Sequence, residues 1–468
     1  MTVGQFSVSR VQQSVVILAV MLSLMVPVNG QAQTYTLLHT FTGGMDGATP
    51  YAGLTWDGGS NFYGTAAQGG YNGTRCYNLF FSPANGCGTV FRLHRSGSNW
   101  SFSTLYEFHG GTVDGNFPTA AVTIARDGSL YGTTWGGDFQ GQRGCEGNNE
   151  TYGCGIVFNL RPPTTACKTA LCFWTETISF AFPGTNDGGG AGPGLGALVF
   201  DQAGNLYGTN WNALGNVGEV TQLVPSGGSW MLGWIYVRGA GGQSDTPNVI
   251  YNGVTFDSAG NLYGTSLQGP DDGPYCRLGR YYNGCGTVYQ LVSTSSGWTA
   301  DELYIFTDGD DGKLPMAGVV ADQAGNLYGT TSADGTGGGG VVFELSPSGG
   351  SWTYHSIYAL PGGNSQAACL LPAGGVGGCT GPWGNLLIDS AGNLYGASYA
   401  NGTYGYGNVF KLTKPNGSWI YTDLYDFNGG NDGANPVGSL ILDGNGNLFG
   451  TTINGGADGY GVAFEISP

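Results

Sequence analysis

The sequence predicts an all-β fold, a seven-bladed β-propeller with four-stranded antiparallel blades. Three observations lead to this expectation. One phrase recurs seven times, strand-like runs surround each copy, and the last copy lacks a fourth strand that the start of the chain can supply. Helical solenoids are excluded by the two-residue periodicity and by the high content of glycine, 90 of 468 residues.

The recurring phrase begins with Asp, continues through small residues that often end in Gly-Asn, and closes on Leu-Tyr-Gly-Thr. Its Tyr-Gly, which is Phe-Gly in the last copy, recurs every 54 to 76 residues, and recurrence of one phrase along a whole chain is typical of repeat folds. The copies are Asp57–Thr65, Asp127–Thr133, Asp201–Thr209, Asp257–Thr265, Asp322–Thr330, Asp389–Ala397 and Asp443–Thr451.

Four strand-like runs belong to each copy. A short apolar run such as Gly318–Val320 precedes the phrase, and the Asp and Gly-Asn residues predict a hairpin turn between the two. A Gly-x-Val-Phe run such as Gly340–Phe343 follows, and then a run that typically opens on Trp and ends in Leu-Tyr-x-Phe, as in Leu424–Phe427. Four antiparallel strands in roughly 60 residues match the size of a propeller blade.

The ends of the chain predict how the ring closes. The seventh unit stops at its third strand, Gly461–Ile466, and Thr34–Phe41 matches fourth strands such as Tyr421–Phe427. We therefore expect the N-terminal strand to complete the last blade, which removes an open sheet edge. A ring of six blades plus one irregular unit is the alternative, because the third copy is short and reads Gly218–Thr221 where the others read Gly-x-Val-Phe.

The first 32 residues resemble a secretory signal peptide. Arg10 supplies positive charge, Val15–Val28 is apolar, and the small residues Gly30 and Ala32 fit cleavage after Ala32. Residues 33–468 then form a single propeller domain, secreted or otherwise extracytoplasmic, monomeric, and without a membrane span after cleavage.

The charge of the chain limits its partners. A net charge of −17 argues against nucleic acid, because a phosphate backbone requires a basic surface. Carbohydrate, extracellular proteins and cations remain as candidate partners, and the acidity also serves solubility.

The ten cysteines fall into five pairs that are close in sequence, as expected of disulfides in a secreted protein. Each bridge closes a short loop and stabilises the fold by roughly 2–3 kcal/mol. A metal site is the weaker alternative, because the chain has four His and no Cys-x-x-Cys. The pairs are Cys76 with Cys87, Cys145 with Cys154, Cys167 with Cys172, Cys276 with Cys285, and Cys369 with Cys379.

The phrase Asp-x-Ala-Gly-Asn-Leu-Tyr-Gly-Thr-Thr, followed by Gly-x-Val-Phe-x-Leu and then Trp…Leu-Tyr-x-Phe, resembles the Gloeo/Verruco (GloVer) tandem repeat of secreted bacterial proteins. The resemblance covers nearly the whole mature chain. It implies a propeller-like repeat without an assigned activity, often joined to a C-terminal anchor. No anchor is evident in this sequence, which argues against surface attachment.

The loops predict two unequal faces. One face carries short, uniform turns, whereas the other carries the long, variable segments 71–87, 135–154, 267–285 and 365–383, with four of the five cysteine pairs. Variable loops on a rigid scaffold usually carry binding, so we expect the long-loop face to hold the site. The candidate ligand-binding residues are Trp135, Phe139, Trp211, Tyr275, Arg277 and Tyr282.

These aromatic residues are candidates because their rings can stack on sugar rings, while Arg277 can orient an anionic group. Packing beneath the loops, and pairing of Arg277 with Asp271 or Asp272, are the alternatives.

A second candidate site consists of the Asp residues in the links that lead into the first strands, several of which read Asp-Gly-x-x-Pro. We expect them to surround the axial opening, where carboxylates can bind a hard cation such as Ca²⁺. The alternative is that each Asp caps a tight turn that Pro stiffens. The residues are Asp46, Asp114, Asp187, Asp311 and Asp432.

Together these features favour a non-catalytic extracellular binding or interaction module for a glycan or a cation, acting through the disulfide-linked loop face. A secreted metal-assisted hydrolase or lyase at the axial opening is the competing hypothesis, and a purely structural role is the third. No Gly-x-Ser-x-Gly, His-Glu-x-x-His or P-loop phrase occurs, so no catalytic residue is predicted.

Overall fold

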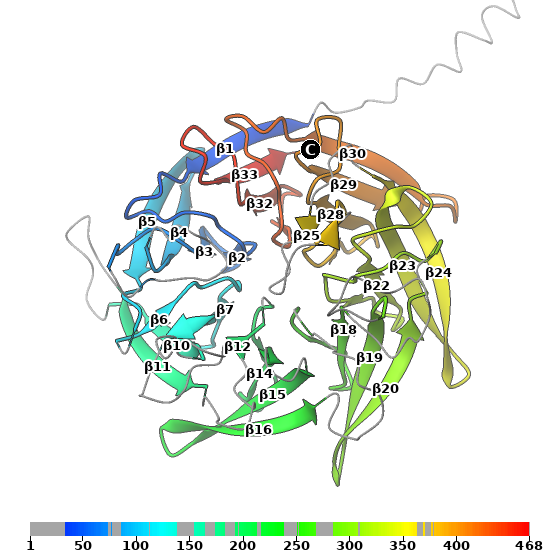
Figure 1. Ribbon diagram of the computed structural model, residues 1–468, viewed down its shortest axis with the longest axis horizontal. Helices are drawn as coiled ribbons and strands as arrows, with labels where there is room; N and C mark the ends of the chain where they lie inside the picture. The colour runs from blue at the N-terminus through cyan, green and yellow to red at the C-terminus, as the bar shows by residue number, and fades with distance from the viewer. Residues whose placement is uncertain are drawn as a thin grey trace, which may run out of the picture.

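The computed structural model of the chain is a ring of β-sheets around a central axis (Figure 1). It has no helix in the part that it describes. That part comprises residues 33–73, 76, 86–111, 113–137, 154–163, 174–182, 192–194, 196–212, 217–237, 250, 252–267, 284–307, 309–362, 368–369, 376–377 and 379–467.

Seven antiparallel sheets form the blades, and each blade has four strands in order from the axis outward. The first three blades are β2 (Thr55–Trp56), β3 (Asn61–Ala66), β4 (Thr89–Ser96) and β5 (Asn99–Glu107); β7 (Thr123–Ile124), β8 (Leu130–Thr134), β10 (Ile156–Arg161) and β11 (Thr175–Ala181); and β13 (Val199–Phe200), β14 (Leu206–Asn212), β15 (Val217–Ser226) and β16 (Ser229–Val237).

Blades four to six continue the same pattern. They are β17 (Thr255–Phe256), β18 (Leu262–Ser266), β19 (Thr287–Thr294) and β20 (Gly297–Ile305); β21 (Val320–Ala321), β22 (Leu327–Thr330), β23 (Gly338–Ser348) and β24 (Ser351–Pro361); and β27 (Leu387–Ile388), β28 (Leu394–Ser398), β29 (Asn408–Thr413) and β30 (Ile420–Asp426).

The seventh blade joins the two ends of the chain. It consists of β31 (Ile441–Leu442), β32 (Leu448–Thr452), β33 (Val462–Ser467) and β1 (Thr34–Thr40). Strand β1 pairs antiparallel with β33, with Tyr35 opposite Ile466, and Figure 1 shows β1 and β33 side by side. The predicted closure is confirmed. The six-blade alternative is wrong, because the third copy of the repeat forms a complete blade.

Short additional strands lie in the links and loops. They are β6 (Gly115–Asn116) with β9 (Gly136–Gly137), β12 (Gly192–Pro193) beside β14, and β25 (Ala368–Cys369) with β26 (Val376–Gly377).

The Asp, Asn and Tyr of the repeat phrase form one hydrogen-bonded turn. In blade 6, Asp389 Oδ1 accepts bonds from the backbone N–H groups of Ala391 and Asn393, both at 2.9 Å. Its Oδ2 accepts bonds from Asn393 Nδ2 at 2.8 Å and from the Tyr395 hydroxyl at 3.0 Å. The phrase therefore recurs because these three side chains together close the turn between the first and second strands.

The Gly of the phrase lies against an aromatic ring of the third strand. A Cβ atom placed on Gly396 would be 2.5 Å from Phe410 Cζ, and one on Gly329 would be 2.5 Å from Phe343 Cζ. Both Phe rings are fully buried. The Gly of the second strand and the aromatic residue of Gly-x-Val-Phe are therefore a matched pair, since any larger residue would displace the ring.

The Trp that opens a fourth strand contacts the preceding blade. The Tyr263 ring of blade 4 meets the Trp352 ring of blade 5 edge to face, with centroids 6.1 Å apart. Further pairs of this kind are Tyr63 with Trp174, Tyr131 with Trp230, Tyr207 with Trp298, and Tyr328 with Trp419. Neighbouring blades are thus joined by the same aromatic contact around much of the ring.

The described residues include no helix long and apolar enough to cross a membrane. Residues 1–32, where a signal peptide is predicted, lie outside the described part.

Candidate functional site

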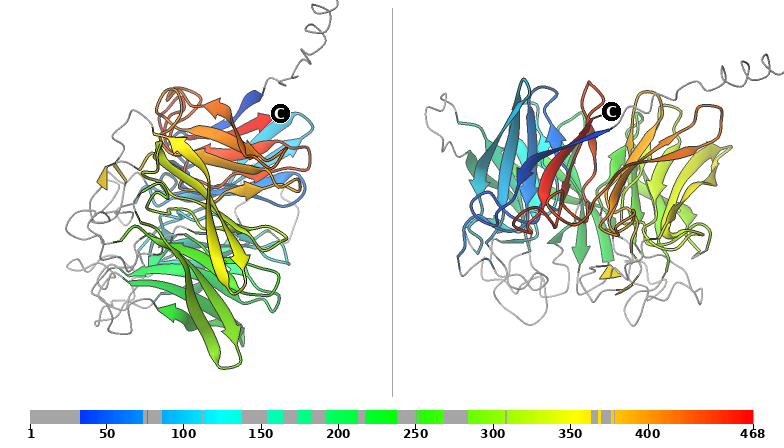
Figure 2. Two further views of the ribbon diagram at one scale, coloured as in Figure 1. Left: turned by 90° about the vertical axis from the view of Figure 1, so that its right-hand side faces the viewer. Right: turned by 90° about the horizontal axis from the view of Figure 1, so that it is seen from above.

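Two rings of side chains meet at the axis on the long-loop face. One ring includes residues four positions before a first strand, as Tyr51, Met316 and Trp383 are. The other includes residues three positions after the repeat's Tyr-Gly, just past the end of a second strand, as Leu267 and Ile453 are. Because both positions lead into loops of the same face, topology places them together. The right-hand view in Figure 2 shows β25 beyond the blade strands at one end of the ring.

Apolar members of the two rings, together with Leu314, Ala333 and Cys379, form one cluster, which we call the axial cluster. Most of its members are buried, while Trp135 and Tyr399 are partly buried and pack against the rest. The buried members are Tyr51, Ala67, Leu267, Leu314, Met316, Ala333, Cys379, Trp383, Val437 and Ile453.

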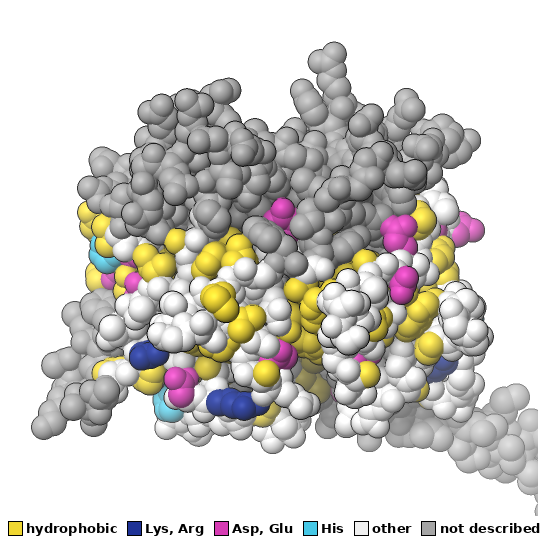
Figure 3. All heavy atoms as spheres, turned by 90° about the horizontal axis from the view of Figure 1, so that it is seen from below, with side chains coloured by type: hydrophobic (Ala, Val, Ile, Leu, Met, Phe, Trp, Pro, Cys, Tyr) yellow, Lys and Arg dark blue, Asp and Glu magenta, His cyan; other side chains and the backbone are white. Residues whose placement is uncertain are grey.

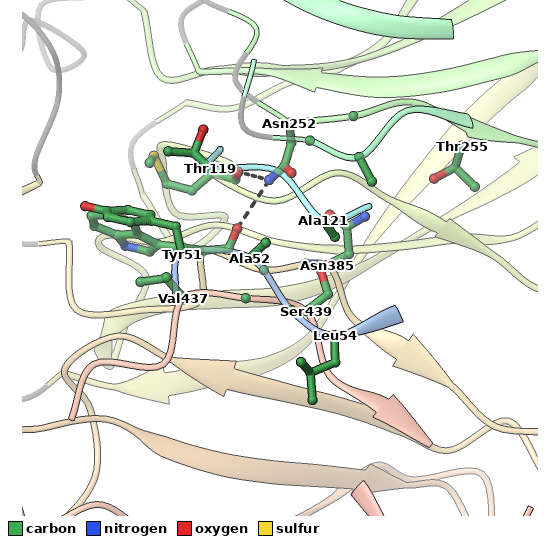
Figure 4. Close-up of a pocket in the computed structure, with 18 of the residues that line it drawn as sticks. Tyr51, Ala52, Leu54, Thr119, Ala121, Asn252, Thr255, Asn385, Val437 and Ser439 are labelled. Carbon is green, nitrogen blue, oxygen red and sulfur yellow. Dashed lines mark hydrogen bonds between the residues drawn. The ribbon is translucent and has the colours of Figure 1, made fainter. Parts of the chain in front are cut away.

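A cavity of about 190 Å³ lies within the ring of first strands (Figure 4). Tyr51, Trp383 and Met316 of the axial cluster contribute to its wall, together with the polar side chains of Asn252 and Asn385. Its described lining contains no Asp, Glu, His, Lys or Arg. The cavity therefore combines aromatic surface with neutral hydrogen-bonding groups.

Small residues allow the blades to converge at this cavity. A Cβ atom on Gly53 would overlap the carbonyl oxygen of Ser439 in the neighbouring blade, and one on Gly196 would overlap the backbone nitrogen of Gly253. The backbones of adjacent blades are thus in direct contact at the axis, which leaves no space for a side chain at these positions.

Amide side chains link the blades around the cavity. Asn252 donates hydrogen bonds from Nδ2 to the carbonyl oxygens of Met316 and Trp383, as the dashed lines in Figure 4 show. Asn385 accepts a 2.7 Å bond from the N–H of Gly318, and its own N–H donates to Ser439 Oγ at 2.9 Å. These hydrogen bonds connect the segments that precede the first strands of blades 4 to 7.

The Trp383 indole carries a buried hydrogen-bond donor. Its ring is 6% exposed and stacks on Tyr399 with centroids 4.5 Å apart and planes inclined by 11°. The buried Nε1–H finds no hydrogen-bond acceptor among the described residues. An unpaired buried donor costs about 1–3 kcal/mol, so an acceptor from outside the protein would relieve a real penalty.

The tyrosines of the axial cluster are held in the neutral form. Burial raises the pKa of Tyr51 well above its usual range, and the proximity of Tyr399 raises it further. Burial likewise raises the pKa of Tyr399. Both hydroxyls therefore keep their protons at neutral pH.

The structure places two of the predicted ligand-binding residues. Trp135 packs against the axial cluster, and the backbone of Trp211 in β14 occupies the equivalent position of its own blade. The side chain of Trp211 lies outside the described part, as do Phe139, Tyr275, Arg277 and Tyr282.

Sequence reasoning missed Tyr51, Met316, Trp383 and Tyr399. A signal was present, because Tyr51, Met316 and Trp383 each follow a Pro at the same place in the repeat. Comparing equivalent positions of all copies, rather than choosing aromatics from the longest loops, would have found them.

The predicted acidic residues cap turns. Asp311 accepts hydrogen bonds from the N–H of Thr307 at 2.9 Å and from the hydroxyl of Tyr304 at 3.0 Å. Asp432 accepts corresponding bonds from Asn428 at 2.9 Å and Tyr425 at 3.0 Å.

The first two acidic links use similar bonds. Asp114 accepts from the N–H of Gly110 at 2.6 Å and the Tyr106 hydroxyl at 2.7 Å. Asp46 accepts from the N–H of Thr42 at 2.9 Å and lies 3.0 Å from His39 Nε2.

These four carboxylates are absent from the described lining of the cavity, and the described residues contain no group of three or more His, Cys, Asp or Glu that could hold a metal. These hydrogen bonds support turn capping by Asp46, Asp114, Asp311 and Asp432, and cation binding by them stays a prediction. Each of the four carboxylates bonds to the fourth strand that precedes it in the chain, which is β1 for Asp46. Asp187 lies outside the described part.

The structure contains the predicted disulfide between Cys76 and Cys87, whose Cα atoms are 4.7 Å apart. Cys154, Cys285 and Cys379 are also disulfide-bonded. Their expected partners Cys145 and Cys276, and the pair Cys167 with Cys172, lie outside the described part, as does the side chain of Cys369.

Comparison with known families and structures agrees with the repeat and the fold. The model of the Gloeobacter/Verrucomicrobia repeat matches residues 357–468, which confirms the resemblance over that part of the chain. No curated protein matches the sequence.

Among solved structures, a polysaccharide lyase described as an ulvan lyase is 11% identical, with a TM-score of 0.50 over 89% of this chain and 93% of the lyase chain. A second structure of such a lyase, bound to -[GlcA(1-4)Rha3S]-, is 10% identical, with a TM-score of 0.50 over 91% of this chain and 95% of the lyase chain. At these identities the likeness supports the fold alone.

Proposed function

We propose that this chain, whose residues 357–468 match the Gloeobacter/Verrucomicrobia repeat, is an extracytoplasmic binding module that holds a neutral sugar residue at the axial cavity. The observation that carries the proposal is the buried Nε1–H of Trp383, which lacks an acceptor among the described residues that surround it. A sugar hydroxyl or ring oxygen supplies such an acceptor.

The composition of the cavity wall fits this ligand class. Sugar rings present apolar C–H faces that pack on aromatic rings and hydroxyls that pair with amides and backbone groups. Tyr51 and Trp383 offer the aromatic surface, while Asn252, Asn385 and Ser439 offer polar groups.

Charge favours a neutral ligand over an acidic one. The described lining has no basic residue, and the chain has a net charge of −17, which repels polyanions. On the side of the ring that Figure 3 shows, Lys and Arg are sparse on the described surface.

The size of the cavity favours one sugar residue. A volume of about 190 Å³ is below the roughly 300–1,000 Å³ of pockets that hold drug-sized ligands. We therefore expect the end or a single unit of a saccharide to enter, with the rest of the chain outside. One of the structurally similar lyases is bound to a carbohydrate, so a ring of this kind is compatible with such a ligand.

The test is binding of neutral oligosaccharides and polysaccharides to the pure protein, measured by isothermal titration calorimetry. Trp383→Phe removes the indole N–H but keeps an aromatic ring, so we expect affinity to fall about 5- to 10-fold, corresponding to the roughly 1 kcal/mol of one hydrogen bond. Trp135→Ala tests the partly buried edge of the axial cluster.

The matched control is Trp56→Phe. Trp56 ends β2 next to the short turn of the opposite face, and its Nε1 already donates to Gly59 at 2.9 Å. Equal affinities for Trp383→Phe and Trp56→Phe, or no binding of any neutral saccharide, would contradict the proposal. Release of shortened products would instead favour the hydrolase or lyase alternative.

A further inference from the structure

The outer strand of blade 6 carries two carboxylates on one face. Strand β30 has a bulge at Leu424, because Tyr425 pairs with Val409 whereas Asp423 pairs with Phe410. Residues three apart in a regular strand point to opposite faces. The extra residue shifts the alternation, so Asp423 and Asp426 both lie on the face that Asn408 and Phe410 share.

This face lies against blade 5. The ring of Tyr421, on the same face, stacks on Tyr358 of β24 with centroids 4.5 Å apart. Asn408 is 1% exposed and links Tyr421 to Asp423. Its Nδ2 donates a hydrogen bond to the Tyr421 hydroxyl at 2.8 Å and another to Asp423 Oδ1 at 3.2 Å.

Two oxygen atoms in this group are buried. Neither Asp426 Oδ1 nor Asn408 Oδ1 has a hydrogen-bond partner among the described residues. The lysines of this blade point elsewhere, since Lys411 lies over the Tyr395 ring and Lys414 over the Trp419 ring. Burial and the charge of Asp426 raise the pKa of Asp423 to about 6.

The repeat does not require these residues. Asp423 pairs with the third-strand aromatic Phe410, and the residues in its position in other blades are Thr104, Glu302, Ser356 and Leu37. Asn408 pairs with Asp426, and the equivalent pairs in other blades differ from it. They are Thr89 with Glu107, Ile156 with Ala181, Glu219 with Val237, Thr287 with Ile305, and Val462 with Thr40. Two acids and a buried amide therefore occur together in blade 6 for a reason other than folding the blade.

We propose that Asp423, Asp426 and Asn408 bind a hard divalent cation of the Ca²⁺ class at the seam between blades 5 and 6. Carboxylate and amide oxygens are the ligands that Ca²⁺ prefers, with water and backbone carbonyls completing the shell. A proton shared by the two acids would neutralise their repulsion but would leave the buried oxygen of Asn408 unpaired. A cation satisfies both requirements once the Asn408 amide turns, because Nδ2 is the group that faces Asp423 in the structure.

The cation also links two parts of the blade. Gly402, in the loop between β28 and β29, approaches Asp426 so closely that a Cβ atom there would be 2.5 Å from Oδ1. Binding at Asp426 therefore fixes this loop of the long-loop face against the outer strand.

The experiment is a Ca²⁺ titration of the EDTA-treated full chain at pH 7, with Tm from thermal unfolding as the readout. In a second measurement Tb³⁺ replaces Ca²⁺, and its luminescence, excited through nearby tyrosine, reports binding. We expect Ca²⁺ to raise Tm with a dissociation constant in the range of about 10⁻⁴–10⁻³ M typical of extracellular modules. Asp426→Asn and Asp423→Asn should each weaken binding at least tenfold. The matched control Asp301→Asn removes an exposed carboxylate of β20 and should leave binding unchanged.

Asn408→Asp distinguishes a cation from a shared proton by the sign of its effect. With a cation site, the third carboxylate should tighten Ca²⁺ binding about tenfold. With a shared proton, it should lower Tm with no recovery on adding Ca²⁺. The proposal is overturned if Ca²⁺ leaves the Tm of the unmodified chain unchanged, or if Asp423→Asn and Asp426→Asn bind Tb³⁺ as well as Asp301→Asn does.

Discussion

The hydroxyl of Tyr35 donates a 2.7 Å hydrogen bond to the backbone carbonyl of Asp432, a residue 397 positions further along the chain. The Tyr35 ring also stacks on Tyr425 of blade 6, with centroids 4.5 Å apart. Strand β1 is therefore held both by pairing with β33 in its own blade and by side-chain contacts with the neighbouring blade.

Substitutions of Tyr35 should separate these contributions. Tyr35→Phe removes the hydrogen bond and should lower the free energy of unfolding by about 1 kcal/mol, whereas Tyr35→Ala also removes the ring and should cost about 3–5 kcal/mol. Equilibrium unfolding in urea measures both. A Tyr35→Ala protein as stable as Tyr35→Phe would show that the ring contact does not contribute to closure.

Gly329→Ala should destabilise blade 5. The added methyl would lie 2.5 Å from Phe343 Cζ, and overpacking of a core typically costs about 1–3 kcal/mol. Gly444→Ala is the control, because Gly444 has no atom within 4 Å of the same position. We expect Tm to fall for Gly329→Ala alone, and the smaller side chain in Gly329→Ala/Phe343→Leu to restore part of the loss. Equal Tm values for the two single variants would refute the matched-pair interpretation.

Two threonines at the same place in the repeat should respond in opposite ways. Thr265 Oγ1 donates a 2.8 Å bond to the carbonyl of Ala317 in the next blade, so Thr265→Val should cost about 1 kcal/mol. Thr330 Oγ1 is buried without a partner among the described residues, so Thr330→Val should be neutral or stabilising. Chemical unfolding of both variants measures the difference, and destabilisation of equal size by both would contradict it.

Glu176 should make stability depend on pH. Burial, and then the charge of Asp114, raises the pKa of Glu176 to about 7, above its usual 4.5. Between these values the folded protein holds a proton that the unfolded chain releases. The contribution of Glu176 to stability is therefore greatest below pH 4.5, falls as pH rises to about 7, and is constant above that.

The measurement is Tm against pH from 4.5 to 8 for the unmodified chain and for Glu176→Gln, which cannot ionise. We expect the unmodified chain to lose stability relative to Glu176→Gln as pH rises through this range. A constant difference between the two would show that Glu176 ionises normally in the folded protein.

The sequence predicted the blades well because the residues that define them act locally. Asp389, Asn393 and Tyr395 close one turn within seven residues, and Gly396 pairs with Phe410 inside the same blade. Such short-range requirements recur in every copy and can be recognised without knowing the ring. The closing strand was predictable for the same reason, since Thr34–Phe41 keeps the pattern of a fourth strand.

The candidate site was less predictable because it forms between copies. Tyr51, Asn252 and Trp383 come from three different blades and meet only when the ring is closed. Conversely, Asp311 and Asp432 looked like members of an axial ring because they repeat, yet their carboxylates bond to Tyr304 and Tyr425. Repetition in sequence shows that a position matters, but not which way its side chain points.

The sequence alone thus determined the number of blades, their strand order and the closure by the first strand, since all of these follow from local patterns counted along the chain. Tertiary structure alone decided which residues meet at the axis and between neighbouring blades, because these contacts join residues separated by 50 to 400 positions. Examples are the hydrogen bonds of Thr265 to Pro315 and of Thr451 to Ala52. Whether Trp383 finds an acceptor, and whether Asp423 and Asp426 share a face, depends on ring closure and on one strand bulge.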